Sequence, residues 1–271
     1  MRKRLLVVAL SGWSLAGCLN TSSVIRVAPD GSGSMEQTIL FNVKNVEKAF
    51  AGMGMKPSGK SSSSSKPIDE AAMKAAAEQL GNGVTLVSVT PVKEPSGFEG
   101  VTARFRFDDV TKLNTEDVLM PGPAKEAAGN AHNRVGFALT RTPAGTSILT
   151  ATFNEPSGGA PKAKAGKNNK GGPGLDDPEV RQIVKNLVKG FRIGFDLEVI
   201  GQVVQTNADY VTGKRITLVE IDVEQLMLEG KKLDSLDKVL GPDTSIEQLR
   251  PYLKDVKGLK INRPVVTVEF R

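Results

Sequence analysis

One cysteine, Cys18, and one histidine, His132, are the residues of this sequence with the widest chemical repertoire. A lone cysteine forms no intramolecular disulfide, and together with one histidine it falls short of the about four ligands of a structural zinc site. Any Ser-His-Asp or Cys-His mechanism would have to use His132, which lies among the loop-forming residues 129–133. The motifs G-x-S-x-G and H-E-x-x-H do not occur in the sequence. We therefore expect no enzyme, with no catalytic residue, metal or cofactor.

Two short motifs match known binding sequences but stand in the wrong local context. Residues 54–61 fit the phosphate-binding pattern G-x-x-x-x-G-K-[ST], yet polyserine follows where that site needs a helix. Residues 30–34, DGSGS, resemble the start of a metal-ion-dependent adhesion site, yet a strand-like segment follows. We interpret the first as linker sequence and the second as a hairpin turn.

The amino-terminal residues have the parts of a secretory signal. Arg2, Lys3 and Arg4 are basic, and the twelve residues 5–16 are almost wholly apolar. Twelve helical residues span about 18 Å, well short of the ~30 Å hydrocarbon core of a bilayer. The segment is therefore expected to direct export without spanning the membrane. Together with the residues that follow it, it is interpreted as a lipoprotein signal peptide that covers residues 1–17.

Residues Leu15, Ala16, Gly17 and Cys18 match the lipobox of bacterial lipoproteins. This resemblance implies that the Cys18 thiol receives a diacylglyceryl group, and that a signal peptidase recognises the three residues before it and cleaves ahead of Cys18. Several acyl chains, at about 0.8 kcal/mol per buried CH₂, give lasting membrane attachment. Leu19 stands where bacteria that sort lipoproteins use Asp for inner-membrane retention, which favours the outer membrane, facing the periplasm. The other interpretation is an ordinary signal peptide with a chance cysteine at its cleavage site.

The charge of the exported chain argues against a nucleic-acid partner. Removal of the three basic residues of the signal leaves 33 basic and 30 acidic residues, a net charge of +3. That excess is too small for phosphate-backbone binding.

Residues 18–271 are predicted to form a single α+β domain. Two stretches, at about 52–66 and 154–174, are rich in Gly, Ser, Lys or Asn and are expected to be mobile loops. Strand patterns dominate the remainder, as in residues 101–107, where apolar and polar side chains alternate. The predicted strands are 24–27, 35–41, 84–89, 101–107, 135–139, 148–153, 195–199, 216–218 and 265–270.

Helix patterns are fewer. The two main predicted helices cover 68–80, which is rich in alanine, and 177–191, which has one clean apolar stripe. A capping box at residues 245–248 opens a short helix to about 253, and residues 43–50 form another candidate. Because short turns join most strands, we expect a mostly antiparallel sheet of about eight to nine strands, with a second hairpin around residues 207–213.

The order of these features resembles the LppM-type bacterial lipoproteins. A lipobox is followed closely by a strand-turn-strand with the sequence Pro29-Asp30-Gly31-Ser32-Gly33, and a later hairpin includes Gly201, Val203, Asn207, Gly213 and Ile216. The resemblance implies an envelope domain with a sheet, flanking helices and a possible lipid or glycolipid ligand. No binding residue of that family can be placed on this sequence.

We therefore expect a lipid-anchored, non-enzymatic envelope protein that binds an apolar ligand or a membrane component. The alternative is a structural or adaptor lipoprotein that docks an envelope protein complex through the lysine-rich residues 162–170.

Overall fold

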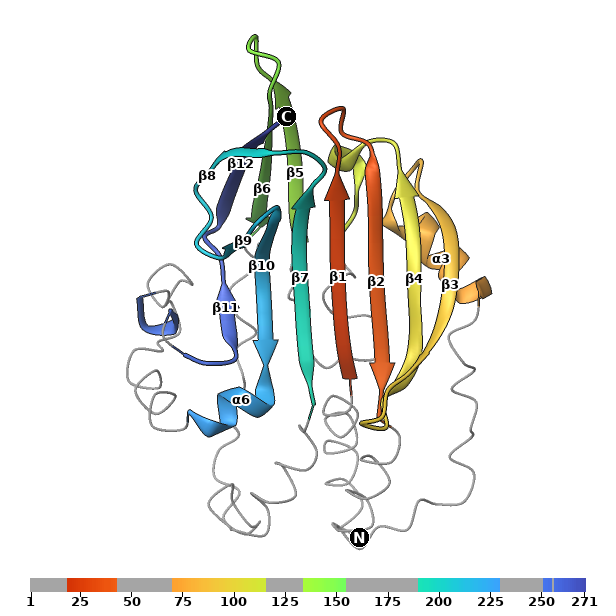
Figure 1. Ribbon diagram of the computed structural model, residues 1–271. Helices are drawn as coiled ribbons and strands as arrows, with labels where there is room; N and C mark the ends of the chain where they lie inside the picture. The colour runs from red at the N-terminus through yellow and green to blue at the C-terminus, as the bar shows by residue number, and fades with distance from the viewer. Residues whose placement is uncertain (1–18, 43–69, 116–133, 155–189, 230–250, 255) are drawn as a thin grey trace, which may run out of the picture.

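A computed structural model describes residues 19–42, 70–115, 134–154, 190–229, 251–254 and 256–271 of the chain. In these residues twelve strands form two sheets, and helices are few (Figure 1). The predicted α+β class with mostly antiparallel pairing is confirmed. The strands are nevertheless divided between an eight-stranded sheet and a four-stranded sheet.

The larger sheet, sheet A, has the strand order β11-β10-β7-β1-β2-β4-β3, and β9 pairs with β10 outside that path. Its strands are β1 (Leu19–Val27), β2 (Gly33–Phe41), β3 (Thr85–Lys93), β4 (Glu99–Phe107), β7 (Arg192–Val199), β9 (Val211–Thr212), β10 (Arg215–Asp222) and β11 (Leu259–Ile261). Sheet B, in the order β5-β6-β12-β8, contains β5 (Arg134–Arg141), β6 (Ser147–Asn154), β8 (Val203–Thr206) and β12 (Val265–Phe270). The helical elements are α3 (Glu70–Leu80), α6 (Val223–Leu228) and the 3-10 helix η2 (Val110–Lys112).

Strand β1 lies at the centre of sheet A and defines its two faces. Ile25 and Val27 are fully buried, whereas Asn20 and Arg26 alternate with the buried positions and point to the opposite face. The strand pairs antiparallel with β2 and parallel with β7, which places Arg192 beside Asn20. The parallel contact makes sheet A a mixed sheet.

One hydrophobic core contains side chains from sheet A, sheet B and α3. Its fully buried aromatic residues include Phe105 and Phe195 of sheet A and Phe270 of sheet B. Complete burial of one such side chain is worth about 1.5–3 kcal/mol, so the core holds the two sheets together. The alanine-rich helix predicted over 68–80 is confirmed as α3, and its Met73 and Ala77 reach this core.

Most predicted strands are confirmed, and several predicted helices and loops lie outside the described residues. The turn after residue 28 connects β1 with β2, and the hairpin at 135–153 is β5–β6. The predicted loops at 52–66 and 154–174 and the predicted helices 43–50 and 177–191 lie outside the described residues, except for residues 154, 190 and 191. Of the predicted helix 177–191, the two described residues, Gly190 and Phe191, are not helical. Of the helix predicted to end at 253, the structure describes residues 251–253, which are helical.

The connection between β7 and β10 corrects one prediction. The two strands pair antiparallel as expected, but the chain between them first crosses to sheet B, where β8 pairs with β12, and then returns as β9. Gly201 permits the crossing with a φ of 144°, and a Cβ at this position would lie 2.3 Å from the carbonyl oxygen of Arg271. The alternation of apolar and polar residues carries no information about so close a contact between backbone atoms. For this reason the sequence predicted a simple hairpin.

Asn262 lies where the chain passes from β11 in sheet A to β12 in sheet B. Its side chain is buried, and its Nδ2 donates to the carbonyl oxygen of Thr217 at 3.0 Å. Its Oδ1 accepts hydrogen bonds from the N–H groups of Asp209 at 3.2 Å and Arg263 at 2.9 Å. One side chain therefore connects β10, the β8–β9 link and the start of β12.

Candidate functional site

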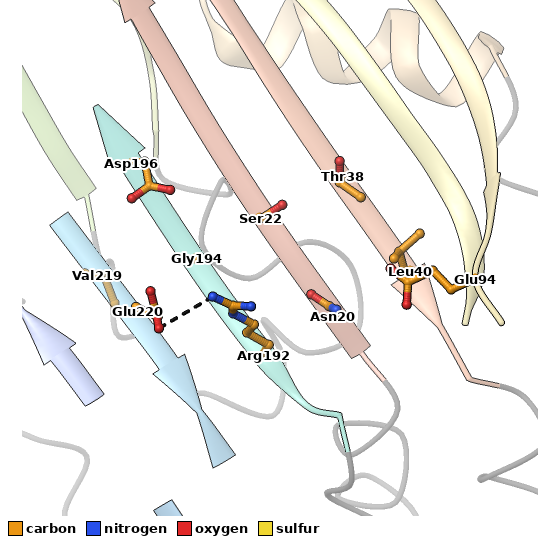
Figure 2. A pocket seen from close by; sticks show the side chains of 10 residues that line it. All are labelled: Asn20, Ser22, Thr38, Leu40, Glu94, Arg192, Gly194, Asp196, Val219 and Glu220. Carbon is orange, nitrogen blue, oxygen red and sulfur yellow. Dashed lines mark ion pairs between the residues drawn. The ribbon is translucent and has the colours of Figure 1, made fainter. Parts of the chain in front are cut away.

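The outer face of sheet A, opposite the core, carries polar side chains that alternate with the core residues. Strands β1, β2, β7 and β10 contribute Ser22, Thr38, Asp196 and Glu220 to this face (Figure 2). Half-buried polar groups from four strands therefore lie within reach of a bound molecule.

Toward the β1–β2 turn, a chain of ion pairs covers the outer face. Glu36 Oε2 accepts a hydrogen bond from Arg104 Nε at 2.8 Å and lies 3.8 Å from the Arg26 guanidinium. Arg26 also lies 3.5 Å from Glu198, which lies 4.0 Å from Arg215. Such partly exposed pairs contribute about 0–1 kcal/mol each, but together they fill this half of the face with ordered side chains.

Toward the start of β1 the side chains are shorter, and the same face contains a pocket of about 200 Å³ (Figure 2). Gly194 of β7 lies in its centre, in register with Ser22 on one side and Glu220 on the other. Glycine inside a strand leaves open space above the sheet, because no side chain fills it. The pocket therefore lies above one glycine, with the short side chain of Ser22 on one side and Glu220 on the other.

The charged groups of the pocket are three carboxylates and one guanidinium. The Arg192 guanidinium lies 3.5 Å from the Glu220 carboxylate (Figure 2), Asp196 lies 3.8 Å from Arg215, and Glu94 accepts a hydrogen bond from the Ser96 hydroxyl at 2.9 Å. Because Arg192, Arg215 and Lys260 lie beside Asp196 and Glu220, the three carboxylates are balanced in formal charge, and the site has no positive excess that would favour an anionic ligand. The pocket is polar and does not have the apolar lining that we expected for a site that binds acyl chains.

The pocket lies at the end of the sheet where the chain enters the described fold. Asn20 and Ser22, which line it, are the second and fourth described residues, and β1 begins at Leu19. The predicted lipidation residue Cys18 and the peptidase residues Leu15, Ala16 and Gly17 lie outside the described residues. An extended chain rises about 3.3 Å per residue, so the Cα atoms of Asn20 and Ser22 lie at most roughly 7 Å and 13 Å from the Cα atom of Cys18.

Two of the features singled out in the sequence, His132 and the lysine-rich residues 162–170, lie outside the described residues. Asp109 caps η2, and its Oδ1 accepts hydrogen bonds from the Thr111 hydroxyl at 2.7 Å and N–H at 2.9 Å, which lower its pKa. Its role is structural.

Asp30 forms a turn, which confirms the interpretation of residues 30–34 as part of a hairpin. Its Oδ1 accepts hydrogen bonds from the Ser32 hydroxyl at 2.7 Å and from the Ser32 N–H at 3.0 Å. These bonds, the hydroxyl first, lower the pKa of Asp30 from 3.8. Within the described part of the chain, no three His, Cys, Asp or Glu side chains are grouped as metal ligands.

Ser32→Ala is expected to raise the pKa of Asp30 part of the way back toward 3.8, because it removes the hydroxyl bond and keeps the backbone bond. A carboxyl whose folded pKa is lowered stabilises the fold above its unfolded pKa, and this contribution is lost as the pH falls through the folded pKa, below about pH 4. An NMR titration of the carboxyl carbons measures the change, with Asp109 as the internal control. An unchanged Asp30 pKa in the variant would contradict the assignment.

The pocket residues were not predicted from the sequence, although one signal for them was available. Gly194 interrupts an otherwise regular strand, and an isolated glycine in a strand marks a close approach or an open space. Nothing local indicated that Asn20, Arg192 and Glu220 would meet, because they lie on three strands far apart in the sequence.

Comparisons with known proteins give one structural similarity. No protein-family model matches the chain, and no curated protein matches it in sequence. The NMR structure of the folded domain of the Mycobacterium tuberculosis LppM protein is similar at 12% sequence identity and a TM-score of 0.33, over 94% of this chain and 90% of that one. No helix among the described residues is both long enough and apolar enough to cross a membrane.

Proposed function

We propose that this protein is a lipid-anchored envelope lipoprotein that binds the polar headgroup of a membrane component in the outer-face pocket. The observation that carries the proposal is the position of the pocket on the first residues of β1, directly after the lipobox cysteine. An acyl anchor at Cys18 would hold the pocket at the level of the headgroups. Strand β1 would then connect the membrane anchor directly to the pocket that binds the headgroup.

The lining of the pocket favours a headgroup that donates hydrogen bonds and carries no net negative charge. Glu94, Asp196 and Glu220 offer carboxylate oxygens, and Asn20 and Ser22 add an amide and a hydroxyl. Carboxylates accept hydrogen bonds from hydroxyl groups, and these charge-assisted bonds are the stronger ones. A hydroxyl-rich glycolipid headgroup fits this chemistry, whereas a phosphate would meet carboxylate oxygens that have no hydrogen bond to donate to it.

Binding rather than catalysis is favoured by the partners of the carboxylates. Glu220 is paired with both Arg192 and Lys260, the latter at 3.2 Å. Asp196 lies close to Arg215. A general acid or base needs a free oxygen within hydrogen-bond reach of the reacting group, and these carboxylates are engaged by neighbouring cations. We therefore propose a non-enzymatic role.

The anchor compensates for a small, open site. A pocket of about 200 Å³ without an aromatic side chain offers few contacts, and a soluble headgroup would bind weakly. A protein held on the membrane meets the headgroup at a high effective concentration, so a weak intrinsic affinity is sufficient.

Gly194→Val is expected to close the pocket without disturbing the strand. A Cβ at this position would lie 3.6 Å from Ser22 Cβ, an ordinary contact, and valine suits a strand. Residues 19–271, which have no acyl chains, are mixed with phosphatidylcholine vesicles that contain a diglycosyl diacylglycerol, and the bound protein is measured by sedimentation. We expect Gly194→Val to lower the affinity at least about tenfold, equivalent to ~1.4 kcal/mol.

The matched control is Ser34→Val, which adds the same side chain to β2 at the other end of the sheet. This variant should bind as the unaltered chain does. Vesicles with phosphatidylglycerol in place of the glycolipid should bind less, because of the carboxylates. Equal binding by Gly194→Val and the unaltered chain would show that the pocket is not the site.

A further inference from the structure

The end of sheet A at which β1 begins has a defined row of side chains. Phe41 is the antiparallel partner of Leu19, and Arg192 of β7 lies beside Asn20. The row continues through Glu99, the partner of Phe41 on β4. Figure 1 shows these strand ends together at the bottom of the sheet.

The distance from the anchor to this row is very short. Cys18 is bonded directly to Leu19, so their Cα atoms are about 3.8 Å apart. Leu19 is already part of β1 and is buried at 3% exposure, with Phe41 opposite. An acylated Cys18 would therefore have no spacer between the acyl chains and the sheet, and the domain could not move away from the bilayer without losing strand pairs.

We infer that this end of sheet A, with Phe41 in contact with lipid, lies against the bilayer surface; the inference rests on the proposed anchoring at Cys18. The sheet then stands on the membrane with the opposite end of its strands directed away. The occupant of the surface is the lipid bilayer itself.

The side chains of the row suit this partner. Phe41 is 39% exposed, and the membrane interface accommodates an aromatic ring. The flanking charges nearly balance, since Arg192 and Lys93 stand with Glu94, Glu99 and Asp222. A row without a positive excess fits the headgroups of a zwitterionic bilayer and does not require anionic lipid.

The opposite end of the strands is well separated from the proposed contact. Val199, at the end of β7, is seven residues from Arg192, roughly 23 Å away along the strand. The next residue, Ile200, is exposed at 49% and gives a second apolar position for comparison. The inference therefore requires lipid contact at position 41 and none at position 200.

Fluorescence of a single tryptophan tests the inference directly. The only tryptophan of the sequence, Trp13, lies in the segment that signal processing would remove, so an introduced tryptophan would be the only one in the mature protein. Full-length chains with Phe41→Trp or Ile200→Trp are expressed, purified from membranes and reconstituted in phosphatidylcholine vesicles that are brominated near the headgroup. We expect loss of most tryptophan fluorescence at position 41 and no loss at position 200.

A second pair of variants tests the same inference if the Phe41→Trp variant does not fold. Acylation would occupy the Cys18 thiol, so Lys93→Cys, at a side chain 75% exposed, provides a single free thiol at the same end for a nitroxide label. Ile200→Cys is its control. The label at position 93 should be shielded from a water-soluble paramagnetic quencher in vesicles, and the label at position 200 should not.

The outcomes separate the inference from the proposed function. Mass spectrometry of the purified chain first establishes whether Cys18 is acylated, and an unmodified Cys18 would overturn the anchoring proposal. An acylated chain with equal signals at both ends, or with lipid contact at position 200, would overturn the orientation and leave the anchor intact.

Discussion

Cys18→Ala is expected to abolish acylation of the protein. The alanine side chain has no thiol to take up the diacylglyceryl group, so incorporation of radiolabelled palmitate should fall to background. The precursor should also keep residues 1–17, because the resemblance to a lipobox implies cleavage at an acylated cysteine. Labelling followed by electrophoresis measures both effects.

Two further variants complete this test. Residues 19–271 behind an ordinary cleavable signal should be exported in soluble form, since each buried CH₂ of the missing chains contributes about 0.8 kcal/mol to membrane attachment. Ser14→Ala, a change within the apolar segment that leaves Leu15 to Cys18 intact, should retain both label and processing. Equal palmitate incorporation by Cys18→Ala and the unaltered chain would contradict the lipobox.

Asn262→Ala is expected to destabilise the fold by roughly 3 kcal/mol. The substitution removes one donated and two accepted hydrogen bonds at a position that is 1% exposed. It leaves the carbonyl of Thr217 and the N–H of Asp209 without the partner that joins them. Urea denaturation of residues 19–271 measures the change in the free energy of unfolding.

Asn207→Ala is the matched comparison for this prediction. Asn207 also uses its amide on backbone groups of β12, the carbonyl of Val265 at 3.1 Å and the N–H of Thr267 at 2.8 Å, but it is only half buried. Water can replace its bonds, so we expect a cost of about 1 kcal/mol. If Asn262→Ala cost no more than Asn207→Ala, Asn262 would not have the connecting role assigned to it.

Most strands of the described fold could be predicted because alternation is a local signal. Residues 101–107 alternate between core and solvent, and β4 covers them with Phe105 and Phe107 fully buried. The turn at Asp30 was equally predictable, since the residues that form its hydrogen bonds are two apart in the sequence. In both cases the interacting groups are close neighbours in the chain.

The division into two sheets could not be predicted in the same way. Strand β8 resembles one arm of a hairpin in its sequence, yet it pairs with β12 because Gly201 and Asn262 hold the crossing in place. Those contacts join residues about 45–70 positions apart, and no local pattern reports them. The parallel pairing of β1 with β7 was missed for the same reason.

The predicted anchor and the candidate pocket depend on different kinds of information. The lipobox consists of four consecutive residues, and a peptidase would read such a segment from the chain itself, so residue order alone leads to the prediction at Cys18. The pocket exists only because Ser22, Gly194 and Glu220 are brought into register by strand pairing, and an open space appears where Gly194 has no side chain. Pairing between distant strands follows from the packing of the whole core. The position of the pocket beside the start of β1 follows from that pairing.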